Sequence, residues 1–368
     1  MQLQGQHVLI LGLGASGLAM ARWCAHAGAD VTVADTRETP PQLAVLQAEW
    51  PAVRFVPGPF EASLVEGTSV RAVFRSPGLA PEVVAPVVDA ARSMGLWQGG
   101  ELSLFAAGLQ DLKARFGYAP QVLAISGTNG KTTVTSLTGQ LVARAGKTVK
   151  VAGNIGPTLL DTLTEAMAQA HVQVEQEAAE RAAAELENQN QVSVPSSVTT
   201  AQETATPAQS QDEPASEVAE TDEMLDGMEA AAELPLPVAP AVQDPMAQAL
   251  PQVWVLELSS FQLDSSEGFE PTAATVLNIS QDHLDWHGSM AAYAAAKARI
   301  FGAQALMVLN REDAQVMAMR PEPVRVKLQK PVERACVLFG GDMPQRPGDF
   351  GIEVTHGMTW LVRALEAD

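Results

Sequence analysis

The feature that most constrains the fold of this sequence is a glycine-rich loop that joins an apolar stretch to an amphipathic one. Residues 121–125 are typical of a short buried strand, and residues 132–145 carry apolar side chains at helical spacing. The loop between them therefore ends at a helix N-terminus, where backbone N–H groups and the helix dipole favour a bound anion. The sequence predicts a phosphate-binding site in an α/β protein.

The side chains of this loop suit a nucleotide phosphate. Lys131 can reach the terminal phosphates, a threonine hydroxyl can ligate Mg²⁺, and glycine lets the backbone approach the ligand closely. The usual pattern has a glycine five positions before the Gly130-Lys131 pair, where this chain has Ile125, so the loop is a shortened variant. We expect nucleotide contacts from Gly127, Thr128, Asn129, Gly130, Lys131, Thr132 and Thr133.

A second glycine-rich turn lies near the start of the chain. Residues 7–11 read as a strand, and a Gly-x-Gly-x-x-Gly sequence at residues 12–17 leads into an apolar helix. The next strand ends at Asp35, where a carboxylate can hydrogen-bond a ribose hydroxyl, and a later strand is followed by Ser76. Alone, this arrangement predicts a dinucleotide site in a Rossmann-like domain. Because a second phosphate loop follows, two nucleotide ligands fit the sequence better.

The acidic charge is concentrated in one segment. The 368 residues carry a net charge of −20, and −16 of it belongs to residues 165–250, which hold seventeen acidic residues and one basic residue, Arg181. The composition of residues 164–251 is typical of disorder, although the alanine and glutamate content of residues 175–187 favours a helix. We therefore expect an acidic insert at 164–251 that interrupts a folded domain.

The remaining sequence is nearly balanced in charge, which excludes some classes of partner. It has no basic patch that would indicate nucleic acid and no apolar run long enough to span a membrane. The first residues lack the positive region of a signal peptide, so we expect a cytoplasmic protein. We also expect a monomer.

Three polar residues follow the insert at the ends of predicted elements. Glu257 ends the apolar strand 253–258, His283 follows the apolar run 274–279, and Lys297 lies in an alanine-rich helix. Alone, His283 is more typical of a loop cap and Lys297 of a solvated helix face. Near a phosphate loop, however, oxygen and imidazole groups suit Mg²⁺, which takes one or two protein carboxylates and keeps several waters.

Together these segments resemble the Mur ligases, and most closely the branch that adds D-glutamate. The resemblance rests on residues 12–17, 35–37, 76–78, 127–133, 153–156, 257–263, 278–285 and 293–300. It implies an N-terminal Rossmann-like domain (1–117) and a central P-loop-type ATPase domain (118–368) with a mainly parallel sheet. The family's third, C-terminal Rossmann-like domain is absent from these residues. A chain without it is expected to bind the uridine substrate and to be inactive alone.

The resemblance also implies ATP-dependent amide ligation in peptidoglycan synthesis. The carboxylate of UDP-N-acetylmuramoyl-L-alanine takes the γ-phosphate of ATP, and the amine of D-glutamate then displaces phosphate from the acyl phosphate. One Mg²⁺ would be held by Thr132 and Glu257, and a second by His283 and a carbamylated Lys297, because an ammonium cannot bind a cation. The implied catalytic residues are Lys131, Asn154, His283 and Lys297. The implied contacts of the uridine substrate are Gly14, Ala15, Ser16, Asp35, Thr36, Arg37, Ser76, Asn154 and His283.

Three other interpretations fit part of the sequence. Another amide ligase of the Mur type would share the phosphate loop. A dinucleotide-binding oxidoreductase would explain the first glycine loop and Asp35, but not Lys131, Glu257 and His283. A non-catalytic nucleotide-binding module would explain the missing third domain.

Overall fold

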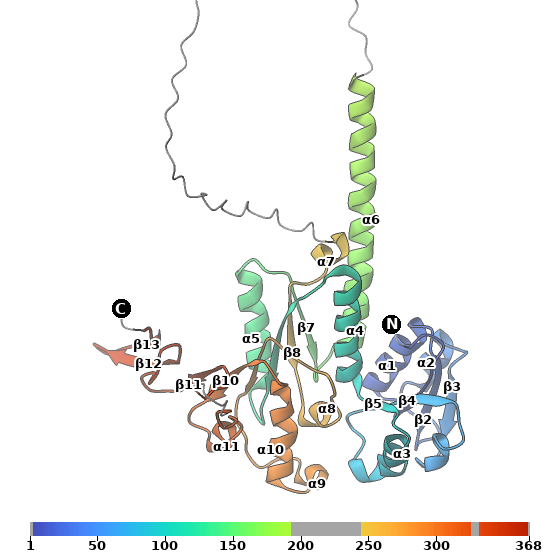
Figure 1. Ribbon diagram of the computed structural model, residues 1–368, viewed down its shortest axis with the longest axis horizontal. Helices are drawn as coiled ribbons and strands as arrows, with labels where there is room; N and C mark the ends of the chain where they lie inside the picture. The colour runs from blue at the N-terminus through green and yellow to red at the C-terminus, as the bar shows by residue number, and fades with distance from the viewer. Residues whose placement is uncertain (1–2, 193–243, 325–330, 367–368) are drawn as a thin grey trace, which may run out of the picture. The chain divides into compact units, whose positions relative to one another are not determined.

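The chain folds into two lobes, each built on a β-sheet, with helix α4 (Glu101–Phe116) between them in sequence (Figure 1). The computed structural model describes residues 3–192, 244–324 and 331–366. Strands and helices alternate through most of both lobes, so the predicted α/β class is confirmed.

The N-terminal lobe has a five-stranded parallel sheet in the order β3-β2-β1-β4-β5. Alternate side chains of its central strand enter two different cores: Val8 and Ile10 face one, Leu9 and Leu11 the other. This is why the strand is apolar from Val8 to Leu11. The strands are β1 (His7–Leu11), β2 (Asp30–Asp35), β3 (Arg54–Pro57), β4 (Val70–Arg75) and β5 (Trp97–Gly99). The helices are α1 (Ala15–His26), α2 (Leu43–Glu49), η1 (Ala62–Leu64) and α3 (Pro81–Ser93).

The central lobe has an eight-stranded sheet in the order β13-β12-β11-β10-β9-β6-β8-β7. Neighbours are parallel except β12 and β13, which form an antiparallel pair at one edge. The strands are β6 (Gln121–Ser126), β7 (Val149–Gly153), β8 (Val253–Glu257), β9 (Ala273–Val276), β10 (Leu306–Asn310), β11 (Cys336–Phe339), β12 (Phe350–Thr355) and β13 (Met358–Arg363). The helices are α5 (Lys131–Arg144), α6 (Leu159–Val192), α7 (Pro245–Ala249), α8 (Ser260–Asp264), α9 (Leu284–His287), α10 (Met290–Ala298), η2 (Arg299–Phe301) and α11 (Ala314–Met317).

Helix α4 contributes side chains to the cores of both lobes. Its Phe105 meets the buried Trp254 of β8 edge to face, with ring centroids 5.2 Å apart. Gly108 of the same helix faces Trp23 of α1, and a Cβ atom at Gly108 would lie 2.8 Å from that indole ring. One apolar cluster therefore runs from the first sheet through α4 into the second.

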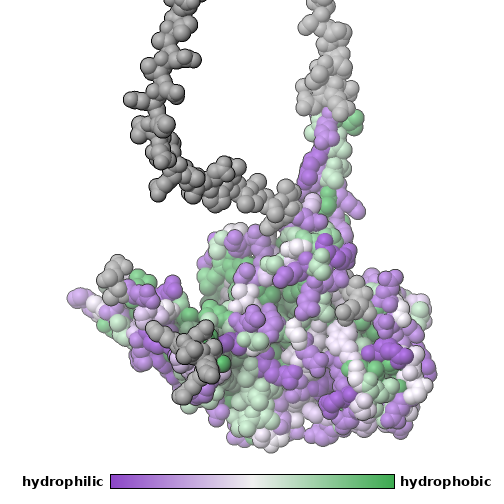
Figure 2. All heavy atoms as spheres, viewed as in Figure 1, coloured by the Kyte–Doolittle hydropathy of each residue, from purple (hydrophilic) through white to green (hydrophobic). Residues whose placement is uncertain are grey.

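Helix α5 is buried only on the side that faces the sheet. Leu137 and Leu141 are 52% and 54% exposed, and Figure 2 shows apolar surface over this helix. None of the helices in the described part of the chain is both long and apolar enough to cross a membrane.

The expected acidic insert overlaps two helices of the structure. Helix α6 begins at Leu159 and continues through the alanine- and glutamate-rich stretch to Val192, and α7 lies at the far end of the insert. The part of α6 from residue 175 onward separates from the two lobes as a unit of its own. The part of the insert from 193 to 243 lies outside the described residues.

The strand order brings the predicted catalytic segments to one edge of the central sheet. Ile125 of β6 and Gly153 of β7 both lie in register with Glu257 of β8, and Ser126 lies in register with Val276 of β9. In parallel sheets, ligands bind at the carboxyl ends of the strands. The loops after β6, β7, β8 and β9 meet at this edge.

Candidate active site

The loop between β6 and α5 has the backbone conformation that its glycines allow. Gly127 has a φ of +151° and Gly130 a φ of +80°, both in the region that favours glycine. A Cβ atom at Gly127 would lie 3.1 Å from the Cβ of Leu277. Helix α5 begins at Lys131 with no side-chain cap, so its first N–H groups remain available to an anion.

The Lys131 side chain folds back over this loop. Its Nζ donates hydrogen bonds to the carbonyl oxygens of Gly127, at 3.1 Å, and Thr128, at 2.9 Å. The ammonium group therefore lies beside the anion-binding N–H groups at the start of α5. Thr132 and Thr133 follow it in the first turn, and both are exposed.

The segment after β9 holds the loop in place. The backbone N–H of Asn129 donates to Oδ1 of Asn278 at 2.9 Å, and Nδ2 of Asn278 donates to the carbonyl oxygen of Asn129 at 3.1 Å. The Thr128 hydroxyl accepts from the N–H of Ser280 at 3.0 Å and lies 3.2 Å from the Tyr293 hydroxyl. Asn278 and Tyr293 therefore support the site. Both lie at the start of segments that carry the resemblance, 278–285 and 293–300, but they are not among the predicted site residues.

Lys297 lies buried beneath the loop instead of on a solvated helix face. It is 1% exposed, and its Nζ donates to the carbonyl oxygen of Gly127 at 2.8 Å and to Oγ of Ser126 at 3.2 Å. Burial and, to a smaller extent, the positive charge of Lys131 together lower the pKa of Lys297 to about 7, while Asp282 opposes the shift. The neutral amine is therefore well populated near neutral pH.

Glu257 and Asn154 lie together at the ends of β8 and β7. The Glu257 side chain is 3% exposed, and its Oε1 accepts a long hydrogen bond, 3.4 Å, from Nδ2 of Asn154. The backbones approach closely, because a Cβ atom at Gly153 would lie 2.1 Å from the carbonyl oxygen of Glu257. A buried carboxylate is costly unless a cation or several donors satisfy it. The position therefore suits a residue that binds a metal ion.

His283 sits among aromatic side chains at the start of α9. Its φ of +52° is unusual for a residue other than glycine, and its Nε2 lies 3.4 Å from Oδ2 of Asp282. Its ring centroid is 4.7 Å from that of Phe261 and 6.2 Å from that of Tyr293. His287, which the sequence did not indicate, stacks on Phe261 at 5.7 Å. This cluster connects the segment after β8 with the helix that carries Lys297.

A separate cavity of about 380 Å³ lies at the carboxyl ends of β1, β2 and β4. All seven N-terminal residues implied as uridine-substrate contacts line it, and the structure thus brings them to one place. They are Gly14, Ala15, Ser16, Asp35, Thr36, Arg37 and Ser76. The other two implied contacts, Asn154 and His283, lie in the central lobe.

Within this cavity Asp35 orients Arg37. One carboxylate oxygen accepts from the N–H of Leu13 at 2.7 Å and from Nη2 of Arg37 at 2.7 Å, and the other accepts from Nε of Arg37 at 2.8 Å. Burial alone would raise the pKa of Asp35, but hydrogen bonds from Arg37 and Leu13 outweigh it and lower the pKa. Both carboxylate oxygens of Asp35 thus accept hydrogen bonds from the protein. The role that this leaves for Asp35 is to hold the Arg37 guanidinium in place for a ligand.

The residues at the phosphate loop suit a Mg²⁺ ion that also binds nucleotide phosphates better than a metal ion held by protein side chains alone. In the three described ranges, no group of three or more His, Cys, Asp or Glu side chains is arranged to hold a metal ion. Mg²⁺ beside a nucleotide needs only one or two protein oxygens, since phosphates and water supply the rest. The buried Glu257 and the exposed hydroxyl of Thr132 offer that pair.

Family models match both lobes. The Mur ligase middle domain matches residues 125–205 and 227–331, about half of the chain, and the Mur ligase MurD-like N-terminal domain matches residues 6–97. The chain belongs to the Mur ligase family. The predicted fold, with its N-terminal and central domains, agrees with both matches.

Curated relatives of this Mur ligase chain are longer than it is. A UDP-N-acetylmuramoylalanine–D-glutamate ligase from Albidiferax ferrireducens is 55% identical over 366 residues, which is 100% of this chain and 57% of the relative. Another of the same name, from Polaromonas sp., is 44% identical over 452 residues, with 100% and 64% covered. The chain therefore spans about three fifths of the length of these relatives.

A solved structure was also matched, a UDP-N-acetylmuramate:L-alanyl-gamma-D-glutamyl-meso-diaminopimelate ligase from Neisseria meningitides. It has a TM-score of 0.46 and 16% identity, with 98% of this chain and 84% of that chain covered. The family assignment does not depend on this match.

Proposed function

We propose that this chain is the uridine-substrate and ATP-binding part of a ligase that adds D-glutamate to UDP-N-acetylmuramoyl-L-alanine in peptidoglycan synthesis. The reaction type is inferred mainly from two lysines that contact the phosphate loop. Lys131 and Lys297 both donate to the carbonyl oxygen of Gly127. The choice of substrate rests on relatives of that name with 55% and 44% identity.

Fixed positive charge is what the first chemical step needs. A substrate carboxylate oxygen bonds to the γ-phosphorus of ATP, the bond to the bridging oxygen breaks, and ADP leaves. Two unit negative charges 4 Å apart repel by about 4 kcal/mol at an effective dielectric constant near 20. Lys131 lies at the loop that would hold the phosphates, so it can offset this repulsion as the transition state forms. The amine of D-glutamate then bonds to the acyl carbon, and inorganic phosphate leaves.

The donor set also suits Mg²⁺. Thr132 and Glu257 would hold one ion, and His283 with Lys297 a second. Bound Mg²⁺ would neutralise negative charge on the polyphosphate. In this proposal Lys297 acts as a carbamate, formed when its neutral amine bonds to CO₂ and releases a proton. The lowered pKa of Lys297, about 7, supports that chemistry, because only the neutral amine is nucleophilic.

The cavity of the N-terminal lobe would hold the uridine nucleotide. The loop Gly14–Ser16 opens helix α1, whose N-terminal N–H groups suit the diphosphate, and Arg37 is held in place by Asp35. Asn154 and His283 would meet the sugar and peptide end in the central lobe. By the plan of the family, the D-glutamate site belongs to the third domain, which closes over the ATP site and excludes water.

Calorimetry on this 368-residue chain tests the proposal. UDP-N-acetylmuramoyl-L-alanine and a non-hydrolysable ATP analogue should each bind, and an Arg37→Ala variant should lose affinity for the uridine ligand alone. Lys147→Ala, at an exposed position away from both sites, serves as the control. Binding of NADH in place of the uridine ligand would instead favour the oxidoreductase interpretation and overturn the proposal.

A further inference from the structure

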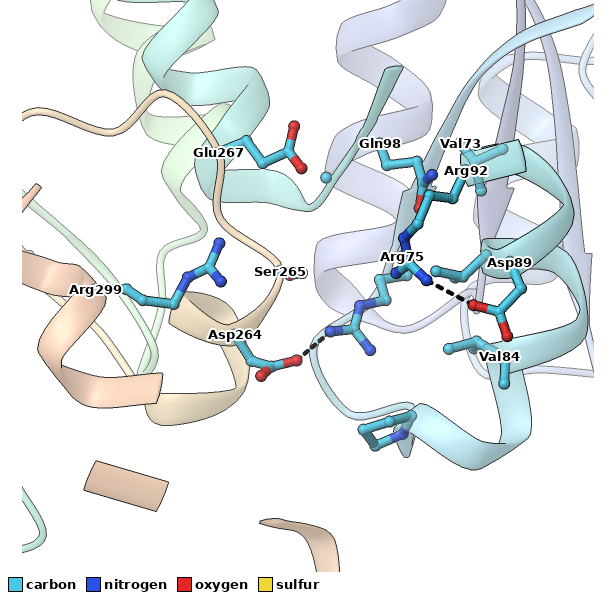
Figure 3. Close-up of a pocket in the computed structure, with 14 residues that line it drawn as sticks. Val73, Arg75, Val84, Asp89, Arg92, Gln98, Asp264, Ser265, Glu267 and Arg299 are labelled. Atoms are coloured by element: carbon cyan, nitrogen blue, oxygen red, sulfur yellow. Dashed lines mark hydrogen bonds and ion pairs between the residues drawn. The ribbon is translucent and has the colours of Figure 1, made fainter. Parts of the chain in front are cut away.

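A cavity of about 420 Å³ is lined by residues of both lobes (Figure 3). It is distinct from the cavity at the carboxyl ends of β1, β2 and β4, here called the uridine-side cavity. The N-terminal lobe contributes residues of β4, α3 and β5 to its lining, and the central lobe contributes Asp264, Ser265, Glu267 and Arg299. Because this space is not filled by side chains, close apolar packing does not join the lobes here. Polar contacts at its rim do so instead.

Residues 264–267, here called the junction segment, are held from three directions. Nη2 of Arg75 forms an ion pair with Oδ2 of Asp264. The Ser103 hydroxyl of α4 accepts from the N–H of Glu267 at 2.9 Å and donates to the carbonyl oxygen of Ser265 at 3.3 Å. Arg299 donates to the carbonyl oxygen of Ser266. The junction segment therefore ties the N-terminal lobe, α4 and the helix region after Lys297 together.

Two partners of the junction segment, Arg75 and Arg299, lie close in sequence to residues of the candidate active site. Arg75 directly precedes Ser76 of the uridine-side cavity, and Arg299 lies two positions after Lys297. Asp264 ends the short helix α8, which follows Glu257. The Arg75 guanidinium also lies 6.0 Å from the ring of Trp286 in α9, the helix that begins after His283. Arg75 thus adjoins the uridine-side cavity in sequence and contacts two elements of the central lobe.

The ion pair between Arg75 and Asp264 is more protected than an ordinary surface pair. Their side chains are 13% and 33% exposed, whereas Arg92 and Asp89, which pair at 2.7 Å on the same cavity, are 69% and 66% exposed. Arg92 and Asp89 both belong to α3, so their pair does not cross between the lobes. Figure 3 shows both pairs. The second pair is therefore a matched control for the first.

We propose that Arg75 and Asp264 are positioning residues that set the distance between the uridine end and the reactive end of a substrate spanning both lobes. The inference rests on the proposed function, in which UDP-N-acetylmuramoyl-L-alanine is that substrate. The affinity of a ligand that touches only one lobe does not depend on the distance between the lobes. A ligand that touches both would have to restore the spacing itself if the pair were lost, and its affinity would fall by that cost.

Calorimetry with three ligands tests whether only a ligand that touches both lobes depends on the ion pair. UDP probes the N-terminal lobe, a non-hydrolysable ATP analogue probes the central lobe, and UDP-N-acetylmuramoyl-L-alanine probes both. Arg75→Asp and Asp264→Arg should each weaken the spanning ligand about tenfold and leave the two short ligands within about twofold, since a lost partly buried pair also leaves one charge unpaired. The double variant, in which the charges are exchanged, should recover most of the loss.

Two further variants keep the test decisive. Asp264→Asn removes the charge but keeps the shape, so it should weaken the spanning ligand even if the charge reversals do not fold, and Arg92→Asp should change no affinity. The inference would be overturned if the affinities for UDP and for the spanning ligand fell equally. It would also be overturned if a folded double variant did not recover affinity for the spanning ligand. If the wild-type chain binds UDP but not the spanning ligand, the proposed function itself fails.

Discussion

The burial of Lys297 leads to a measurable pH dependence of stability. Its pKa falls from 10.5 to about 7 in the folded chain. A difference of about 3.5 pKa units corresponds to roughly 5 kcal/mol, the free energy by which the charged lysine opposes folding below pH 7. The hydrogen bonds from Nζ to Gly127 and Ser126 offset part of the cost of burying this charge.

The sign follows from proton binding. Between about pH 7 and pH 10.5, the unfolded chain holds a proton on Lys297 that the folded chain has released. The free energy of unfolding of the wild type therefore rises with pH in this window by up to about 1.4 kcal/mol per pH unit. Lys297→Met removes the titration. Between pH 7.5 and 9.5, the stability of the wild type relative to this variant should increase by about 2–3 kcal/mol.

Urea unfolding followed by tryptophan fluorescence measures this difference, in CO₂-free buffers at three pH values across the window. Lys147→Met, at an exposed lysine, is the control and should differ from wild type by a constant amount. Bicarbonate should stabilise the wild type but not Lys297→Met, because carbamate formation consumes the neutral amine of the folded chain. A difference between wild type and Lys297→Met that does not change with pH would refute the reasoning.

Three further outcomes are expected. In a complete enzyme, Lys131→Ala should lower ligation by orders of magnitude with uridine-substrate binding kept, and turnover within about tenfold of wild type would contradict its role. Lys297→Ala should lose activity and regain part of it with added acetate or formate; if neither restores activity, the carbamate role fails. Gly17→Ala should lower the free energy of unfolding by about 3 kcal/mol, since its Cβ would lie 2.0 Å from the Gly12 carbonyl oxygen. Thermal melts against Gly14→Ala, where a Cβ meets no atom within 4 Å, check this, and equal melting temperatures would contradict it.

The strands of the fold could be predicted because runs of apolar residues in the sequence indicate which segments are buried. The strand β8 is buried at every position, so its run of apolar residues stands out, and its final carboxylate marks the edge that holds the candidate site. Both glycine loops could also be predicted, since Gly12 in the first and Gly127 and Gly130 in the second adopt positive φ values at the turn into a helix.

The environment of individual side chains could not be predicted in the same way. Lys297 lies in a helix of alanines, which has no distinct polar face, so the sequence could not separate a buried lysine from a solvated one. The pair of Arg75 and Asp264 joins residues far apart in the chain, and no local pattern encodes such a contact. His283 adopts a left-handed backbone that only its surroundings can impose.

The strand order of the central sheet also determines when this site can form during synthesis. The strand β8 lies between β6 and β7, so these two earlier strands do not pair with each other. At about 5–20 residues per second, the ribosome needs roughly 5–20 s to make the stretch from Gly153 to Val253. The N-terminal sheet, whose strands are complete by Gly99, can close during this delay. The nascent chain would therefore carry a finished uridine-side cavity while the phosphate loop still waits for its neighbouring strands.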